Sequence, residues 1–314
     1  MAHNLFLGMY TFNIKKSRTS NENLISNNDF LSNSYPDIEG SKFGEGFVKD
    51  VVSFIDSKTF KNSRNTHGGV LEEKALNSMN RTLDIMIDGG ITGLKQFLIE
   101  EDGEKSEISD KVTVGLKFFA RIWLPGGSNT GYVFIQKYGS LSIKPLFDDL
   151  IAKVYRKHGY SVIGGKLSPS TTKARMKEFL KKSRLRDLVI VSQKNPNQTG
   201  APNSTGATIR IRNVNIKKST RRIDNEDINN VLKDHGFKIG KRSYLIKATY
   251  ENKTEEYNEE KTVIIDGSEE TINVIPSVLL PNDCINVDNH PVFDRMREFT
   301  DEERVQVMIE AKLN

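Results

Sequence analysis

Cysteine is nearly absent from this chain of 314 residues, because Cys284 is its only one. No intrachain disulfide can form, so the fold depends on its buried core, and the composition suits a reducing compartment. No second cysteine and no nearby pair of histidines completes a thiolate metal site. We therefore expect Cys284 to be an ordinary, partly buried thiol.

Long apolar runs are also absent. Nothing approaches the roughly 20 apolar residues that cross a bilayer as a helix. Residues 1–10 lack the basic start and the apolar stretch of a secretion signal. We therefore expect a cytoplasmic protein that does not contact a membrane. The richness in Asn, Lys, Ile and Glu is typical of an AT-rich bacterial or phage genome.

The motifs that would name a reaction are missing as well. The chain has no Gly-x-x-x-x-Gly-Lys-Ser/Thr loop, no Gly-x-Gly-x-x-Gly turn after a strand and no nucleophile elbow. Its five histidines are scattered without metal-ligand spacing. These absences argue against P-loop NTPases and Rossmann dehydrogenases, and we expect no cofactor and no metal. Whether the chain is an enzyme stays open, although the sequence favours a protein without catalytic activity.

What the sequence does contain is a mixture of helical and strand patterns. Alternation over 116–124 and 132–138, around a Pro- and Gly-rich loop, predicts a hairpin. Because strands and helices follow without strict βαβ order, we expect an α+β fold with a mixed, largely antiparallel sheet and packed helices, as one large or two modest domains. Further predicted strands are 5–14, 82–87, 94–99, 188–191, 208–216 and 244–250, predicted helices are 47–55, 71–79, 145–158, 168–183 and one opened by Thr300, and 15–44 is a predicted loop.

The charge distribution is the strongest functional signal. Residues 166–222 hold fifteen Lys and Arg against Glu178 and Asp187, a net charge of +13 in a chain of net +5. Residues 251–314 hold sixteen acids and six cations, a net charge of −10. The shift near residue 160 predicts an N-terminal α+β region with the aromatic hairpin, 1–160, and a C-terminal α+β region, 161–314, that is basic over 166–222 and acidic over 251–314.

A local positive field of this size attracts polyanions. We therefore hypothesise a nucleic-acid-binding accessory protein without strong sequence preference, for DNA or RNA, with bacterial mobile-element or phage-defence systems as its context. Arg121 and Trp123 of the hairpin would add a stacking surface for bases, unless both faces of the hairpin are packed. The predicted phosphate contacts are Lys173, Lys177, Lys181, Lys182, Arg184, Arg210, Arg212, Lys217, Lys218, Arg221 and Arg222.

Two alternatives stay open. The basic middle could dock onto an acidic surface of a protein partner or of a second copy, which would make the chain an assembly subunit or a homo-oligomer. Alternatively, Glu251 and Lys253 after an apolar strand, with Asp224, Asp227 or Asp234 upstream, resemble the acid and acid-x-Lys arrangement of metal-dependent nucleases. Mg²⁺ is expected only in that last case.

Overall fold

The computed structural model divides the chain into two compact units. Unit 1 comprises Met1–Ser170 and Ser277–Asn314, and unit 2 comprises Thr171–Pro276. The C-terminal segment thus belongs with the N-terminal part of the chain, whereas the charge pattern predicted a boundary near residue 160 with 161–314 as one region. The structure describes residues 5–17, 23–36, 45–55, 60–93, 96–99, 102–109, 112–139, 141–175, 184–192, 208–212, 244–254, 257–266 and 278–313.

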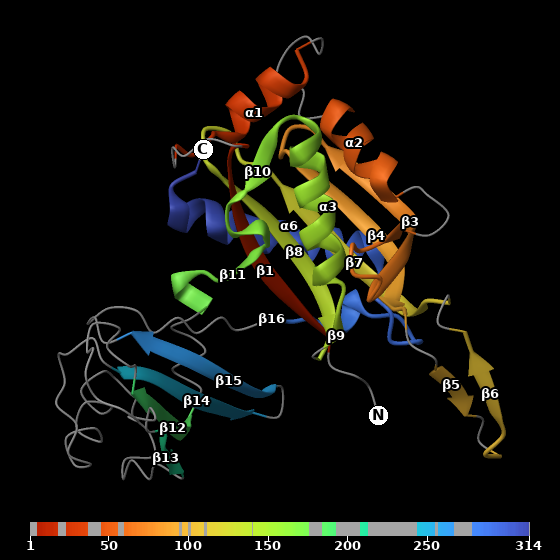
Figure 1. Cartoon of the computed structure of the whole chain (residues 1–314), viewed down its shortest axis with the longest axis vertical. Helices are drawn as coiled ribbons and strands as arrows, with labels where there is room; N and C mark the ends of the chain where they lie inside the picture. The colour runs from red at the N-terminus through yellow and green to blue at the C-terminus, as the bar shows by residue number, and fades with distance from the viewer. Residues whose placement is uncertain are drawn as a thin grey trace, which may run out of the picture. The chain divides into compact units, whose positions relative to one another are not determined.

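Unit 1 is built on a ten-stranded sheet (Figure 1) in which every described pairing is antiparallel. The predicted α+β class with a largely antiparallel sheet is therefore confirmed. The main path runs, in spatial order, through β10 (Tyr160–Val162), β1 (Leu5–Lys16), β8 (Thr130–Tyr138), β7 (Val114–Trp123), β4 (Thr82–Ile91), β3 (His67–Asn77) and β2 (Phe60–Lys61).

Strand β1 holds distant parts of the chain together. One of its edges pairs with β8 from Leu5 to Asn13. Along its other edge it pairs in turn with three short strands, β16 (Val278–Leu279), β11 (Ser168–Ser170) and β10. Residues from both ends of the unit therefore meet on one strand, which explains why 277–314 belongs to unit 1.

Three helices cover one face of this sheet (Figure 1): α1 (Asn27–Ser34), α2 (Glu45–Ile55) and α3 (Lys144–Lys157). The apolar stripe of α3, including Leu146, Leu150 and Val154, packs with Phe30 of α1 and Phe47 of α2 in the larger of two apolar cores. Pro145 lies in the first turn of α3, where its missing N–H is tolerated. The helices predicted at 47–55 and 145–158 are confirmed.

The opposite face carries the second core and one long helix, α6 (Phe293–Ala311). Phe119 and Trp123 of β7 and Phe134 of β8 pack there with Met296 of α6. Cys284, in the short 3₁₀ helix Asn282–Cys284, is buried in this core, and burial raises the pKa of its thiol to about 11. The thiol is therefore protonated at neutral pH, as a structural cysteine should be.

Several predicted elements are wrong. Most of the helix predicted at 71–79 lies in strand β3, which ends at Asn77. The strand predicted at 94–99 is β5 (Gln96–Ile99), which pairs with β6 (Lys105–Ile108) in a separate two-stranded sheet. The predicted loop 15–44 contains α1. Thr300 lies inside α6, which begins seven residues earlier at Phe293.

Unit 2 contains a four-stranded antiparallel sheet. Its order is β13 (Thr208–Arg212), β12 (Arg184–Ser192), β14 (Tyr244–Thr254) and β15 (Tyr257–Asp266). The apolar run 188–191 lies in β12, an interior strand, as its unbroken pattern predicted. The pairing of β12 with β14 is irregular between Leu185 and Asp187. The alternation over 208–216 changes phase and so predicts a bulge near Asn213, which lies outside the described residues.

A polar cluster joins α1, α2 and α3 on one face of the sheet of unit 1. Asp50 of α2 is buried and accepts hydrogen bonds from Tyr35 Oη (3.0 Å), after the end of α1, and from Lys157 Nζ (2.5 Å), at the end of α3. His158 Nε2 lies 2.6 Å from the same carboxylate. Burial alone would raise the pKa of Asp50, but the hydrogen bonds from Lys157, His158 and Tyr35 outweigh it, and the pKa is lowered.

We expect Asp50→Asn to lower the free energy of unfolding at pH 7 by about 1–3 kcal/mol, because charge-assisted hydrogen bonds are lost. A lowered folded-state pKa means that the stabilisation is complete above the unfolded pKa of about 3.9. It is then lost as the pH falls through the folded-state pKa. Urea unfolding of both proteins between pH 2.5 and 7 checks this: the difference between them should shrink below pH 4, and a constant difference would contradict the assignment.

Candidate functional site

The structure describes four of the eleven predicted phosphate-binding cations. Lys173 begins a helical turn, residues 173–175, whose N-cap is Thr172 because its Oγ1 accepts a hydrogen bond from the Arg175 amide (3.2 Å). The pattern of the helix predicted at 168–183 favours Ser168 or Ser170 as its N-cap, and this is wrong, since both residues lie in β11 (Ser168–Ser170). Arg184 lies in β12, and Arg210 and Arg212 lie in β13. Seven cations lie outside the described residues: Lys177, Lys181, Lys182, Lys217, Lys218, Arg221 and Arg222.

Strand register places three cations of unit 2 on one face of its sheet. Arg210 pairs with Val189, which pairs with Lys247 of β14, and Arg212 pairs with Asp187. Paired residues share a face and successive residues alternate between faces. One row contains Arg210, Val189 and Lys247, and the next row on the same face contains Arg212 and Asp187. Together the two rows contain three cations and one acid. The positions of the opposite face are apolar, namely Ile209, Ile211, Leu188, Ile190, Ile246 and Ala248.

The two candidate nuclease residues lie within a strand. Strand β14 continues to Thr254, so Glu251 and Lys253 do not follow a strand end, and they pair with Glu260 and Asn258 of β15. The upstream acids, Asp224, Asp227 and Asp234, lie outside the described residues. Within the described ranges no group of three or more His, Cys, Asp or Glu side chains is placed to hold a metal ion.

The hairpin residues Arg121 and Trp123 are both buried, with exposed fractions of 3% and 2%. Trp123 stacks at 4.8 Å between ring centroids on Tyr132 of the paired strand. The hairpin is therefore packed on both faces, which was the alternative to a base-stacking surface. The physical reason is α6, which covers the face that carries these two residues.

Burial of Arg121 creates a network of charges between the sheet and α6. Its Nε donates to Asp84 Oδ1 (2.5 Å) and its Nη2 to Asp84 Oδ2 (3.0 Å), a two-point pairing across β7 and β4. Its Nη1 also donates to Asp301 Oδ1 (3.2 Å), and its Nη2 to the carbonyl of Arg297 (3.0 Å). Arg297 Nε also donates to Asp84 (3.3 Å), and Arg304 donates to Asp301 (2.8 Å). Five alternating charges thus fix α6 on the sheet.

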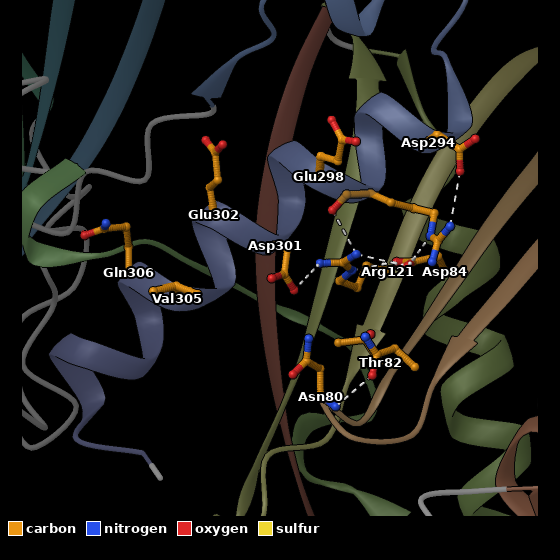
Figure 2. A pocket seen from close by; sticks show the side chains of 12 residues that line it. Asn80, Thr82, Asp84, Arg121, Asp294, Glu298, Asp301, Glu302, Val305 and Gln306 are labelled. Carbon is orange, nitrogen blue, oxygen red and sulfur yellow. Dashed lines mark hydrogen bonds and ion pairs between the residues drawn. The ribbon is translucent and has the colours of Figure 1, made fainter.

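A cleft of about 870 Å³ opens above this network, between α6 and the ends of β3 and β4 (Figure 2). Its floor contains Asp84 and Arg121, and its α6 side contains the carboxylates of Asp294, Glu298 and Asp301. The lining is mostly polar, and its charged groups sum to −3. The lining residues are Asn77, Asn80, Thr82, Asp84, Arg121, Asp294, Arg297, Glu298, Asp301, Glu302, Val305 and Gln306.

Sequence reasoning missed this cleft. The one available signal was the series Asp294, Glu298 and Glu302, whose spacing of four places them on one side of a helix. Because the helix was predicted to start at Thr300, Asp294 and Glu298 fell outside it. The three acids therefore did not stand out as one side of a helix. The partners Asp84 and Arg121 lie 37 residues apart, and no local pattern links them.

No described helix is both long enough and apolar enough to cross a bilayer. Comparisons with known proteins add no assignment to this geometry: no family model, no curated protein and no solved structure matches the chain.

Proposed function

We propose that the chain is a cytoplasmic accessory protein that binds nucleic acid through residues 166–222, without strong sequence preference. The observation that carries the proposal is the net charge of +13 over this stretch. Phosphate contacts supply the sequence-independent part of nucleic-acid affinity. A mobile-element or phage-defence system is the proposed setting.

The register of the unit 2 sheet supports the proposal. Arg210 and Arg212 lie two residues apart on β13, or about 6.8 Å, and Lys247 lies in the row of Arg210 two strands away, or about 9.6 Å. Consecutive phosphates of a duplex strand are several ångströms apart, so a row of cations on this scale suits a phosphate backbone. Arg121 and Trp123 are not part of the proposal, because they are buried.

Anisotropy of labelled single- and double-stranded DNA and RNA, measured across a salt series, tests the proposal. Each neutralised phosphate should steepen the log–log dependence of affinity on salt by about 0.7–0.9. We expect Lys173→Glu, Lys177→Glu and Lys181→Glu together to reduce this slope by about 2–3 and to abolish binding at physiological salt. No binding by the unmodified protein at low salt would overturn the proposal.

A matched control is the triple reversal Lys49→Glu, Lys74→Glu and Lys105→Glu, whose residues are exposed in unit 1. It changes the net charge equally, so equal losses in both triple variants would show a general charge effect and no site. Parallel samples with Mg²⁺ test the nuclease alternative: shortening of the strand that Glu251→Gln prevents would favour it.

The second candidate function is assembly. The opposed charges of 166–222 and 251–314 favour docking between copies or onto a partner. Light scattering across a salt series tests the self-assembly form, because an assembly held by these charges should dissociate as the salt concentration rises. A monomer at every salt concentration would exclude self-assembly.

A further inference from the structure

We infer that the cleft beside α6 is a binding site for an extended peptide rich in arginine or lysine. The inference goes beyond nucleic-acid binding, because it concerns unit 1 and holds whether or not the basic stretch binds a polyanion. Four features carry it: an unpartnered buried hydroxyl, a row of acids, a floor arginine that is already held by protein acceptors, and a lining with one aliphatic residue.

The hydroxyl belongs to Thr82, a cleft residue with an exposed fraction of 1%. Its Oγ1 has no hydrogen-bond partner in the described part of the chain. Leaving such a group unsatisfied costs a folded protein about 1–3 kcal/mol. A bound donor, such as a guanidinium or ammonium N–H, would satisfy it.

The row of acids lies along α6 (Figure 2). Asp294, Glu298 and Glu302 follow at intervals of four residues, or about 6 Å of helix rise each. Like charges at this spacing destabilise a helix by a few tenths of a kcal/mol per pair, and this cost is offset only where an acid has a cation beside it. Arg297 and Arg295 pair with Asp294 and Glu298, whereas Glu302 has no ion-pair partner among the described residues.

The floor of the cleft favours a cation over an anion. Four of the five N–H groups of Arg121 donate to Asp84, Asp301 and the Arg297 carbonyl. An anion would therefore gain little from this guanidinium, and it would meet the acids of α6. A cation meets carboxylates with free lone pairs and the Thr82 hydroxyl.

The spacing indicates the form of the ligand. Alternate residues of an extended chain are about 6.6–6.8 Å apart, close to the 6 Å rise between successive acids. Val305 is the one aliphatic side chain in the lining, so affinity would come from charge and hydrogen bonds. Arginine or lysine at alternate positions of a peptide fits both conditions.

The test uses the full chain and a fluorescein-labelled decapeptide that alternates arginine and serine. We expect binding that Glu298→Gln with Glu302→Gln weakens at least tenfold. The matched control, Glu45→Gln with Glu73→Gln, removes two exposed acids elsewhere in unit 1 and should leave affinity unchanged. Equal affinity in all three proteins, or no binding, would overturn the inference.

Thr82→Val separates a ligand contact from a structural role. It removes the hydroxyl with little change of shape, so we expect unfolding stability to be kept or raised while peptide affinity falls about fivefold. Unchanged affinity in this variant would mean that the Thr82 hydroxyl does not contact the peptide, and it would overturn the inference of a peptide site in this cleft. Spermine competition distinguishes the source of the cation: weak displacement supports a peptide site, and tighter binding of spermine than of the peptide would overturn the peptide assignment.

Discussion

Replacing Asp84 by asparagine should lower the free energy of unfolding by about 3–5 kcal/mol, because it leaves a buried charge without its partner. Asp84 is 1% exposed and Arg121 is 3% exposed, and the pair is bound at two points. Arg121 would keep Asp301, whose side chain is partly exposed, as its remaining carboxylate. This second contact places the expected loss toward the lower end of that range.

Urea unfolding followed by circular dichroism measures the effect. Asp294→Asn is the matched control, because Asp294 belongs to the same network but its side chain is 79% exposed, and its loss should change stability by less than about 0.5 kcal/mol. The double variant Asp84→Leu with Arg121→Met removes both charges and should recover most of the stability. A small loss in Asp84→Asn would contradict a structural role for the pair.

The hairpin shows which structural features a local sequence pattern predicts and which it does not. Its strands and its loop follow from alternation and from Pro125, and both are confirmed. The second face of β7 mixes Lys117 and Arg121 with Phe119 and Trp123, however, so the pattern alone does not say whether this face is covered. That cover is α6, which is distant in sequence, and it turns Arg121 from a predicted nucleic-acid contact into a buried structural group.

Two errors have a common cause. Residues 71–79 contain Leu, Glu, Lys and Ala, which favour helix, but pairing with β4 places most of them in β3. Thr300-Asp-Glu-Glu303 has the form of a capping box, yet it lies within α6, where Thr300 is buried against the sheet. In both places tertiary packing outweighs a local preference, and a single sequence does not show that packing.

The basic stretch 166–222 and the α6 cleft also differ in whether the sequence alone reveals them. A net charge is a sum over sequence, so the basic stretch can be predicted without a structure. The α6 cleft combines Thr82 with Glu302, which come from distant parts of the chain and meet because β1 pairs with segments from both ends of unit 1. Such a site requires the fold before it can be recognised.

Gly90→Ala should destabilise unit 1 by about 1–3 kcal/mol through overpacking. Gly90 of β4 pairs with Gly68 of β3 and with Gly115 of β7, so three glycines cross the sheet in one row. A Cβ at Gly90 would lie 2.1 Å from the Val114 carbonyl oxygen and 2.7 Å from Gly115 Cα. Both are backbone atoms, so no side-chain rotation relieves the clash, and the β4–β7 pairing has to shift.

The sign of this effect distinguishes packing from chain entropy. Gly→Ala at a compatible position usually stabilises a protein by about 0.4–1 kcal/mol, because the unfolded chain loses freedom. Gly126→Ala is the matched control: its Cβ would approach only the flexible end of Arg81, at 3.2 Å, and we expect no loss. If thermal unfolding showed no greater loss of stability in Gly90→Ala than in Gly126→Ala, the close approach of β4 and β7 would not restrict which side chain residue 90 can carry. A loss confined to Gly90→Ala would instead mean that the glycine row sets how closely these strands approach.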